Sequence, residues 1–331
     1  MTLQMVDTSL VLVFGVSVLL FAAGFGGAQM LSASFYDSSC PMMKSIVAAT
    51  VAQHLLQDIT SAAPLLRIFF HDCFVSGCDA SVLLDSTNGN SAEKDAQPNQ
   101  TLSQFNIIDE IKNQLEKLCP GVVSCADIIA LASREAVAQS GGPRWMAEMG
   151  RRDGRKSSAL DASLHLPSTR SSAQPLIDSF AALGLNTRDL VTLSGAHTFG
   201  RAHCFAVARR FIGFNSSNGI DPTLDTVYAQ RLRRLCPLPI DPRARVALDP
   251  VTPNQFDTEY FQDLLVNQGI FSSDSALVLD SRTKNFVNEY ATNTSSFFVQ
   301  FPLAMTKLGR IGVLTGQSGE IRKTCHAVNS F

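Results

Sequence analysis

The chain has 331 residues, of which 45% are hydrophobic, with 27 basic and 29 acidic residues and a formal net charge of −2. This length and composition are enough for one large domain or two modest domains with a full hydrophobic core. The balanced charge argues against a nucleic-acid partner, because proteins that bind nucleic acids normally carry a basic patch and a high pI.

Residues 1–28 are predicted to be a secretory signal peptide. The run from Leu10 to Ala28 is uncharged and ends in small residues, with Gly26 and Ala28 at the expected cleavage positions. An uncleaved membrane anchor is the alternative, because the first nine residues contain Asp7 but no basic residue and the apolar run is almost long enough to span a bilayer. We favour cleavage, and no later segment is apolar for long enough to span.

The cysteines favour an oxidising compartment. An even number in a chain with a signal peptide predicts four disulfides, although eight cysteines allow 105 pairings. A zinc site is the competing interpretation for Cys73 and Cys78, but no second close cysteine pair and no suitably spaced histidine pair accompany them. The cysteines are Cys40, Cys73, Cys78, Cys119, Cys125, Cys204, Cys236 and Cys325.

Most long segments have helical periodicity, so the predicted fold is mainly α. Two helix starts carry capping patterns, Ser124 with Asp127 and Asn186 with Asp189. Strand-like alternation is short and rare. The predicted helices include residues 105–118, 125–139, one long helix over 189–211, 226–235, 257–268 and 295–309.

The segment RIFFHDCFVSGCDASVLL combines ionisable residues with apolar neighbours in an unusual way. If the residues after Pro64 form a helix, Arg67 and His71 are four positions apart and share one face. A cation and a titratable base would then point into one cavity. The alternative is an ion pair between Arg67 and Asp72 with a structural histidine, and the spacing alone does not choose between them.

The end of this segment is suited to a calcium ion. Asp72, Asp79 and Ser81, with nearby carbonyl groups, offer the hard oxygen ligands that calcium prefers. A disulfide between Cys73 and Cys78 could close the same short loop. Together these features would fix the end of the helix.

A second histidine, His197, lies among the small residues Gly195, Ala196 and Gly200. Small residues allow a flat, bulky group to approach the backbone. A lone helical histidine is more often structural than a ligand. Two histidines on different helices, one beside an arginine, nevertheless suggest a haem held between them with one histidine on the iron.

The sequence closely resembles the secreted plant haem peroxidases called class III. The resemblance covers essentially the whole chain from Gln29 onward, and its two histidine motifs together are highly specific. It implies an all-α, two-lobed fold in which residues 29–331 form one haem peroxidase domain, with haem b between a distal and a proximal lobe. The motifs are SFYDSSCP, LLRIFFHDCFVSGCDASVLLD, EKDAQPN, VSCADIIALASREAV, GGPRW, GRRDG, DLVTLSGAHTFGRAHC, FDTEYFQDLL, FSSDSAL and IRKTC.

The resemblance assigns catalytic roles to five residues. His197 would be the axial ligand of the haem iron, and Asp274 would accept a hydrogen bond from the other ring nitrogen of His197. His71 would take a proton from hydrogen peroxide and return it to the departing oxygen, while Arg67 would stabilise the developing negative charge. Asn99 would accept the proton of the far His71 nitrogen and leave the near nitrogen free as a base.

The resemblance also implies two calcium sites, a donor site and the disulfide pairing. Pro167 matches a proline near the exposed haem edge, where aromatic donors dock. Leu248 stands where the family usually has phenylalanine near the proximal face of the haem. The distal calcium ligands would be Asp72, Val75, Gly77, Asp79 and Ser81, with Glu93 acting through water. The proximal ligands would be Thr198, Asp249, Thr252, Gln255 and Asp257. The disulfides would be Cys40–Cys119, Cys73–Cys78, Cys125–Cys325 and Cys204–Cys236.

The sequence therefore predicts a secreted, monomeric haem peroxidase of the cell wall, with two calcium ions and no membrane attachment after cleavage. It would reduce hydrogen peroxide to water while oxidising phenolic donors one electron at a time. Family-implied roles are wall cross-linking, lignification, peroxide removal and stress response. A non-catalytic haem- or calcium-binding wall protein is the alternative. An intracellular ascorbate-type peroxidase is opposed by the signal peptide and the eight cysteines.

Three Asn-x-Ser/Thr sequences, at Asn99, Asn215 and Asn293, agree with secretion as possible glycosylation sites. Asn99 cannot serve both as an acceptor for a bulky glycan and as the buried partner of His71. We expect it to be unmodified.

Overall fold

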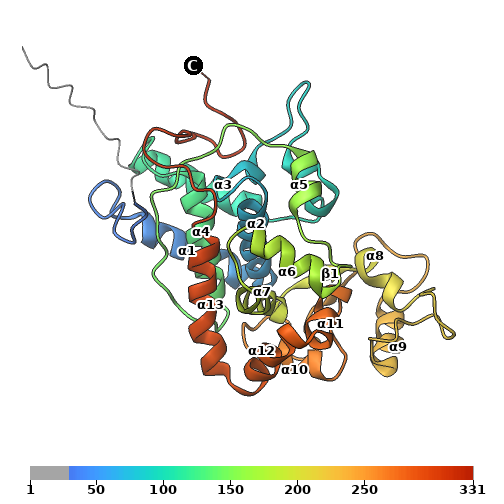
Figure 1. Ribbon diagram of the computed structural model, residues 1–331. Coiled ribbons are helices and arrows are strands. Elements are labelled where there is room, and N and C mark those ends of the chain that lie inside the picture. The colour runs from blue at the N-terminus through green and yellow to red at the C-terminus, as the bar shows by residue number, and fades with distance from the viewer. Residues whose placement is uncertain (1–29, 331) are drawn as a thin grey trace, which may run out of the picture.

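Helices dominate the computed structural model, which describes residues 30–330 (Figure 1). The predicted signal peptide, residues 1–28, lies outside this range. Among the described residues, no helix has both the length and the apolar character needed to cross a membrane.

The α-helices are α1 (Met43–Gln57), α2 (Ala62–Val75), α3 (Phe105–Leu118), α4 (Cys125–Gln139), α5 (Ala159–His165), α6 (Ala173–Ala182), α7 (Thr187–Ser194), α8 (Cys204–Val207), α9 (Thr226–Leu235), α10 (Glu259–Leu265), α11 (Ser272–Leu279), α12 (Ser281–Thr292) and α13 (Thr294–Leu308). The 3₁₀ turns are η1 (Ile59–Ser61), η2 (Ser81–Leu83), η3 (Glu93–Asp95), η4 (Gln97–Asn99), η5 (Gly195–Thr198) and η6 (Ala208–Arg210). Strands β1 (Arg201–His203) and β2 (Arg245–Ala247) form an antiparallel pair in which Ala202 lies opposite Val246. The mainly α prediction is confirmed.

Local signals placed several helices correctly. Helices α3, α4 and α9 have the predicted bounds. Helix α7 begins with the predicted reciprocal capping box between Asn186 and Asp189. At α4, Ser124 caps the backbone N–H of Asp127, but the Asp127 carboxylate bonds Tyr36 and Arg151 instead of closing the box. The Asp127 side chain, which would complete a capping box, therefore belongs to a hydrogen-bond network with residues remote in sequence.

The long helix predicted over residues 189–211 is wrong. The chain leaves the helix after α7, forms η5, and enters β1 before α8. Gly200 has φ +102°, in the left-handed region that favours glycine, and its backbone bonds Pro253 and Leu248. Pairing with β2, about 40 residues further along the chain, therefore replaces helical hydrogen bonds in this segment.

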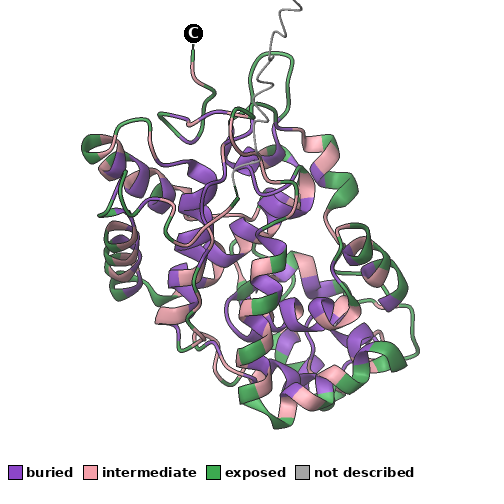
Figure 2. Ribbon diagram, turned by 60° about the vertical axis from the view of Figure 1, so that its left-hand side comes forward, coloured by how far each residue is buried: buried purple, intermediate pink, exposed green. Residues whose placement is uncertain are grey.

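Two groups of helices carry the two histidines. Helix α2, which holds His71, packs against α4, and α1 packs against α3 and α4. Segment η5, which holds His197, packs against α7 and α10, and α12 joins α7, α10 and α13. Buried positions form a continuous interior through both groups (Figure 2). A second, smaller hydrophobic cluster lies around α8, η6, α9 and the β1–β2 pair.

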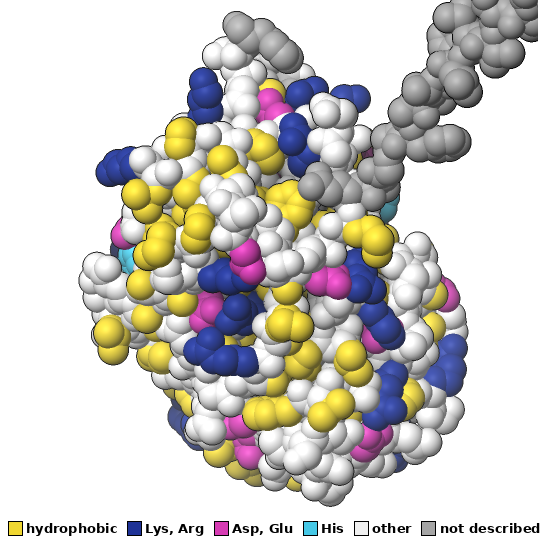
Figure 3. Space-filling view, turned by 90° about the vertical axis from the view of Figure 1, so that its left-hand side faces the viewer, with side chains coloured by type: hydrophobic (Ala, Val, Ile, Leu, Met, Phe, Trp, Pro, Cys, Tyr) yellow, Lys and Arg dark blue, Asp and Glu magenta, His cyan; other side chains and the backbone are white. Residues whose placement is uncertain are grey.

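All four expected disulfides are present: Cys40–Cys119, Cys73–Cys78, Cys125–Cys325 and Cys204–Cys236. The disulfide between Cys73 and Cys78 rules out the zinc interpretation, since a bonded sulfur is not available as a thiolate ligand. The Cys204–Cys236 bond lies within the smaller hydrophobic cluster. On the face shown in Figure 3, basic and acidic side chains are interspersed with apolar ones.

Candidate active site

Helix α2 places Arg67 and His71 together, as their four-residue spacing predicts. The Nε–H of Arg67 donates to Nε2 of His71 at 3.1 Å. The remaining guanidinium contacts are bonds to Thr101 Oγ1 and to the Pro98 carbonyl, both at 2.9 Å. Three of the roughly five N–H donors of an arginine are thus occupied, and about two remain for a ligand.

Asn99 in η4 determines which nitrogen of His71 carries the proton. The Asn99 amide nitrogen donates to the Glu93 carbonyl at 2.8 Å, which turns Oδ1 of Asn99 toward Nδ1 of His71 at 2.6 Å. Since Oδ1 can only accept, Nδ1 of His71 must be the donor. Nε2 then carries the lone pair, in agreement with the hydrogen bond that it accepts from Arg67.

The surroundings of His71 keep the ring neutral. Burial, followed by the positive charge of Arg67, lowers the pKa of His71 to about 3, and the bond to Asn99 opposes this only in part. Burial also lowers the pKa of Arg67, to about 10, so Arg67 remains a cation at neutral pH. The site therefore combines a neutral base with a fixed positive charge.

The alternative pairing of Arg67 with Asp72 is wrong. Asp72 is fully buried and accepts the backbone N–H groups of Ala80 and Val82 at 2.9 and 3.4 Å. The Asp72 carboxylate therefore belongs to the loop after α2.

His197 in η5 has one fixed nitrogen and one free nitrogen. Its Nδ1 lies 2.8 Å from Oδ1 of Asp274, which also accepts the Tyr260 hydroxyl at 2.9 Å. The other Asp274 oxygen accepts the Phe271 backbone N–H at 2.8 Å. The Nδ1–H of His197 donates a hydrogen bond to this carboxylate, so in the neutral ring the lone pair is on Nε2.

These features fit a haem iron ligand. The His197 side chain is 35% exposed although Asp274 beneath it is buried, and no hydrogen bond to Nε2 is present among the described residues. A neutral imidazole with a free, accessible lone pair is the form that binds iron.

Two of the small residues near His197 are needed for close packing within the protein. A Cβ at Gly195 would lie 2.6 Å from Phe297, and a Cβ at Gly200 would lie 2.7 Å from Cβ of Ala63. Both glycines thus permit close packing between protein segments. The Gly200 contact brings the His197 segment against the start of α2.

The predicted distal calcium loop gathers buried oxygen atoms that lack partners. Neither carboxylate oxygen of Glu93 nor Oγ of Ser81 has a hydrogen-bond partner among the described residues. Burial raises the pKa of Asp72, Asp79 and Glu93, and Glu93 reaches about 8. Mutual repulsion with Asp79 and Glu93 raises the Asp72 value further. A bound cation would relieve both the burial and the repulsion.

Backbone geometry supports this loop. Gly77 has φ +107°, and a Cβ there would lie 2.6 Å from the Gly312 carbonyl oxygen. Its carbonyl accepts the Asp79 N–H at 2.8 Å, so Gly77 forms the tight turn of the loop. Val75 ends α2 immediately before it.

The predicted proximal calcium residues also lie together. Thr198 Oγ1 donates to Asp257 at 2.8 Å, and Thr252 Oγ1 donates to Asp249 at 2.9 Å. Burial raises the pKa of Asp249. Gln255 follows Thr252 in the same segment, and its backbone N–H donates a hydrogen bond to the Thr252 carbonyl at 3.0 Å.

No three His, Cys, Asp or Glu side chains within residues 30–330 converge to hold a metal by themselves. Both calcium sites would therefore need hydroxyl and carbonyl oxygens as well as carboxylates.

Comparison with known proteins identifies the family. A family model described as Peroxidase matches residues 47–293. "Peroxidase 27" of Arabidopsis thaliana is 46% identical over 94% of this chain and 96% of its own length. "Lignin-forming anionic peroxidase" of Nicotiana sylvestris is 45% identical over 90% of this chain and 91% of its own length. The chain is a member of the plant peroxidase family. It is an enzyme that depends on hydrogen peroxide.

Several residues of this peroxidase that support the site were not predicted from sequence. Tyr260 is a second donor to Asp274, and Thr101 holds Arg67. Arg322, fully buried, donates to the carbonyls of Ala80 and Cys325 and so connects the C-terminal disulfide to the loop of the predicted distal calcium site. No local pattern marked these roles, because the contacts with Asp274, Arg67 and Ala80 join residues that are 14 or more positions apart in sequence.

Pro167 and Leu248 are both half-buried. Pro167 follows α5, and the Cδ1 atom of Leu248 lies 3.8 Å from the position that a Cβ would take at Gly200.

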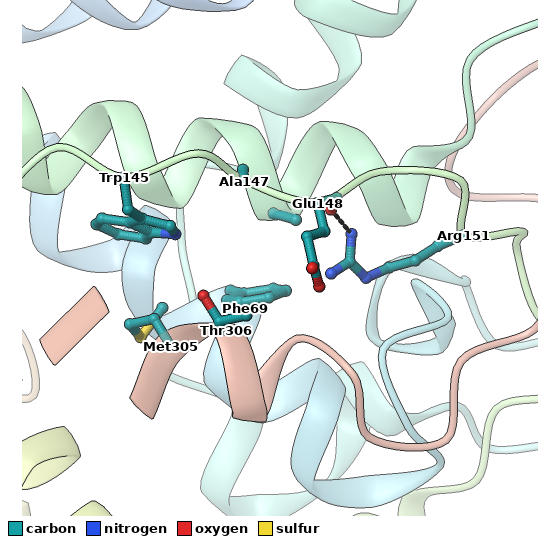
Figure 4. A pocket seen from close by; sticks show the side chains of 8 residues that line it. Phe69, Trp145, Ala147, Glu148, Arg151, Met305 and Thr306 are labelled. Carbon is teal, nitrogen blue, oxygen red and sulfur yellow. Dashed lines mark hydrogen bonds between the residues drawn. The ribbon is translucent and has the colours of Figure 1, made fainter. Parts of the chain in front are cut away.

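A cavity of about 10 Å³ lies on another face of α2, between Phe69 and Trp145 (Figure 4). It is about the size of one water molecule. Trp145 packs edge-on against Phe301 at 6.1 Å, in agreement with a core-packing role.

Proposed function

We propose that this peroxidase is a secreted haem enzyme in which haem b lies between α2 and η5, with His197 as the iron ligand. The observation that carries the proposal is the matched state of the two histidines. His71 and His197 each have Nδ1 directed at a fixed oxygen acceptor, which leaves the lone pair on Nε2; in His71 that nitrogen also accepts the hydrogen bond from Arg67. A bound haem would supply the iron that takes up hydrogen peroxide and accepts its two oxidising equivalents.

His71 acts first as a base and then as an acid. Its Nε2 lone pair takes a proton from hydrogen peroxide, and the ring becomes a cation beside Arg67. Because the pKa of His71 is only about 3, that cation is a strong acid and readily gives the proton to the departing oxygen. The low pKa thus favours the second transfer, while the tautomer fixed by Asn99 permits the first.

Arg67 stabilises the negative charge that develops as the O–O bond breaks. Its side chain is held by Thr101 and the Pro98 carbonyl before the substrate arrives. A donor that needs no reorganisation during the reaction contributes more to transition-state stabilisation than a mobile one. Arg67 is therefore both the fixed charge of the site and a cause of the low His71 pKa.

On the opposite side, Asp274 orients His197 and makes its ring a stronger electron donor. Tyr260 and the Phe271 N–H fix the Asp274 carboxylate from two directions. Asp274 and Tyr260 are positioning residues that act through His197.

We further propose that one calcium ion binds Asp72, Val75, Gly77, Asp79 and Ser81, with Glu93 through water, and a second binds Thr198, Asp249, Thr252, Gln255 and Asp257. The raised pKa of the buried carboxyl groups and the unpartnered oxygens support the first site. Thr198 directly follows His197, so the second site would brace the iron ligand.

The donors are small phenols, oxidised one electron at a time near Pro167. The enzyme is a monomer, exported by cleavage of residues 1–28, and residues 29–331 form one haem peroxidase domain. The non-catalytic alternative is not favoured, because Arg67, His71, Asn99, His197 and Asp274 are all present in bonded positions.

A visible absorption spectrum tests the proposal. The purified protein should show a haem Soret band that shifts on addition of one equivalent of hydrogen peroxide and returns after two equivalents of guaiacol. His197→Ala should lose the haem band, whereas His71→Ala should keep it but react with peroxide slower by about 10²–10⁴-fold. A protein without a Soret band, or His71→Ala within threefold of the wild type, would contradict these assignments.

A further inference from the structure

Arg210 is a buried arginine that lies beside the segment carrying Asp274, the hydrogen-bond partner of His197. It belongs to η6, which follows the short helix α8. All five N–H groups of its guanidinium donate a hydrogen bond to the protein. An arginine that has every donor occupied has none left for a ligand, so its role lies in the groups that it holds.

Three of the five bonds go to the start of α11 and to the residues just before it (Figure 1). Nη1 donates to the carbonyls of Gly269 and, at 3.0 Å, of Phe271. Nη2 donates to Oγ of Ser275 at 3.0 Å. Asp274 lies in the first turn of α11, between Phe271 and Ser275 in sequence. Arg210 therefore holds the chain on both sides of Asp274.

The other two bonds fix Arg210 itself. Nε donates to Asp221 at 3.0 Å in an ion pair that is buried on both sides, and Nη2 donates to Oγ1 of Thr223 at 2.8 Å. Asp221 is fixed in turn, because it accepts the backbone N–H and the hydroxyl of Thr223 at 2.9 and 2.7 Å. Since Asp221 neutralises the charge of Arg210 at short range, the effect of Arg210 on Asp274 is one of position more than of charge.

The direction of the Asp274 carboxylate depends on Phe271. Oδ2 of Asp274 accepts the backbone N–H of Phe271 at 2.8 Å, and Oδ1 accepts the Nδ1–H of His197 at 2.8 Å. The ring of Phe271 also packs edge-on against the His197 ring, with centroids 5.3 Å apart. Because Arg210 holds the Phe271 carbonyl, a shift of this residue would change both the hydrogen bond of His197 and the packing of its ring.

We propose that Arg210 is a positioning residue that sets the hydrogen bond between Asp274 and His197, and thereby the electron donation of the iron ligand. The inference rests on the proposed function, in which His197 binds the haem iron. A strong hydrogen bond from Nδ1 makes the imidazole a better donor to the metal, which stabilises ferric iron relative to ferrous iron. When Arg210 is replaced, Phe271 and Asp274 shift, this bond weakens, and the ferrous form gains.

Arg210→Lys in the haem-loaded enzyme is the first test. Lysine keeps the positive charge, but its three rotatable donors do not reproduce the fixed fork of a guanidinium. The start of α11 keeps another anchor, because the Ser273 N–H donates to the Thr169 carbonyl at 3.1 Å, so Asp274 should shift without being released. Loss of a direct partner of a metal-bound histidine costs about 10–100-fold in affinity or activity, and we expect a smaller change, about two- to tenfold, in the ferric–ferrous equilibrium constant. Spectroelectrochemical titration of the Soret band measures it.

A second readout reports on the hydrogen bond itself. In the ferric enzyme with cyanide bound, the Nδ1–H proton of His197 should give a paramagnetically shifted NMR signal. In Arg210→Lys this signal should move, and the proton should exchange with deuterium faster than in the wild type. Ser275→Ala removes only one of the bonds of Arg210 and keeps every charge, so it should change both readouts in the same direction by a smaller amount.

Arg151→Lys is the matched control. Arg151 is also a buried arginine, paired with Asp127 at 2.9 Å and bonded to the Gly309 carbonyl at 2.9 Å. Within residues 30–330, none of its hydrogen bonds goes to α11 or to His197. This variant should lose stability in urea unfolding much as Arg210→Lys does, but it should leave the iron equilibrium and the Nδ1–H signal unchanged.

A folded Arg210→Lys variant with the iron equilibrium and the Nδ1–H signal of the wild type would overturn the inference. If that variant does not fold, Ser275→Ala decides in its place, and unchanged readouts there overturn the inference equally. So would changes of the same size in Arg151→Lys, because general loosening of the protein would then explain them. A wild type that binds no haem, or a His197→Ala variant that keeps the wild-type iron spectrum, would instead refute the proposed function itself.

Discussion

Replacing Asn99 tests how the distal site selects one tautomer of His71. Asn99→Val removes the acceptor that lies 2.6 Å from Nδ1 of His71 and leaves that N–H buried without a partner. An unsatisfied buried donor costs about 1–3 kcal/mol. The tautomer of His71 that has its lone pair on Nε2 is disfavoured by that amount relative to the tautomer with the proton on Nε2.

Converted to rates, about 1–3 kcal/mol corresponds to roughly a 5- to 150-fold decrease in the rate constant for the reaction with peroxide. Haem binding should be retained, because Asn99 has no contact with His197. The expected loss is thus smaller than that for His71→Ala, which removes the base altogether.

Asn99→Asp is the informative companion variant. A carboxylate accepts the same bond, so the tautomer is kept, but its negative charge favours protonated His71. An opposite charge at this distance raises a pKa by about 1–3 units. From a starting value of about 3, the acid limb of the peroxide reaction should move to about pH 4–6. Both variants lose the bond to the Glu93 carbonyl, so the difference between them isolates the acceptor.

Stopped-flow measurement of the second-order rate constant for peroxide, from pH 3 to pH 8, checks both variants. Circular dichroism and the Soret band report whether each variant is folded and loaded with haem. The reasoning is refuted if Asn99→Val reacts within twofold of the wild type, or if the acid limb of Asn99→Asp stays where the wild type has it.

Further predictions concern stability and modification. Chelation of calcium should lower the melting temperature, and more at pH 8 than at pH 5. Burial raises the pKa of Glu93 to about 8 in the folded, calcium-free protein, so a protonated Glu93 contributes to the free energy of unfolding at low pH. That contribution is lost as the pH rises through the folded pKa. Equal melting curves with and without chelator would count against the calcium sites. Arg322→Met should destabilise the protein by about 1–3 kcal/mol in urea unfolding, because the carbonyls of the calcium loop lose their donor; Arg243→Met, on the surface, is the control. Gly195→Ala should reduce stability and expression, since its Cβ would lie 2.6 Å from Phe297; normal unfolding would show that the core can shift. Asn99 is 2% exposed, so glycopeptide mass spectrometry should find it unmodified, and substantial occupancy in active enzyme would exclude its role.

Local sequence signals were sufficient where a helix is defined by its own residues. Helix α9 begins where Asp225 caps the Tyr228 N–H and ends at the predicted residue. The segment around His197 could not be predicted in this way. Its path depends on pairing with β2 and on the Gly200 bonds to Pro253 and Leu248, all remote in sequence.

The same distinction, between contacts that are local in sequence and contacts that are remote, applies to the candidate site. The four-residue spacing of Arg67 and His71 predicted that they share one helix face, although it did not by itself exclude an ion pair between Arg67 and Asp72. Asn99 lies 28 residues from His71, and Asp274 lies 77 residues from His197, so only the family resemblance could assign them. Tyr260 and Arg322 were missed because their polar atoms act inside networks that exist only in the folded chain.

The Cys125–Cys325 disulfide has a consequence for the order of events during synthesis. Cys40 and Cys73 meet their partners 79 and 5 residues later, but Cys125 must wait for 200 residues. At roughly 5–20 residues per second, this delay lasts on the order of 10–40 s. During that interval Cys125 is a thiol that can attack the disulfides already formed. A chain that stops short of Cys325 has seven cysteines and therefore keeps at least one unpaired thiol, whichever cysteine carries it, and this thiol distinguishes it from a completed molecule.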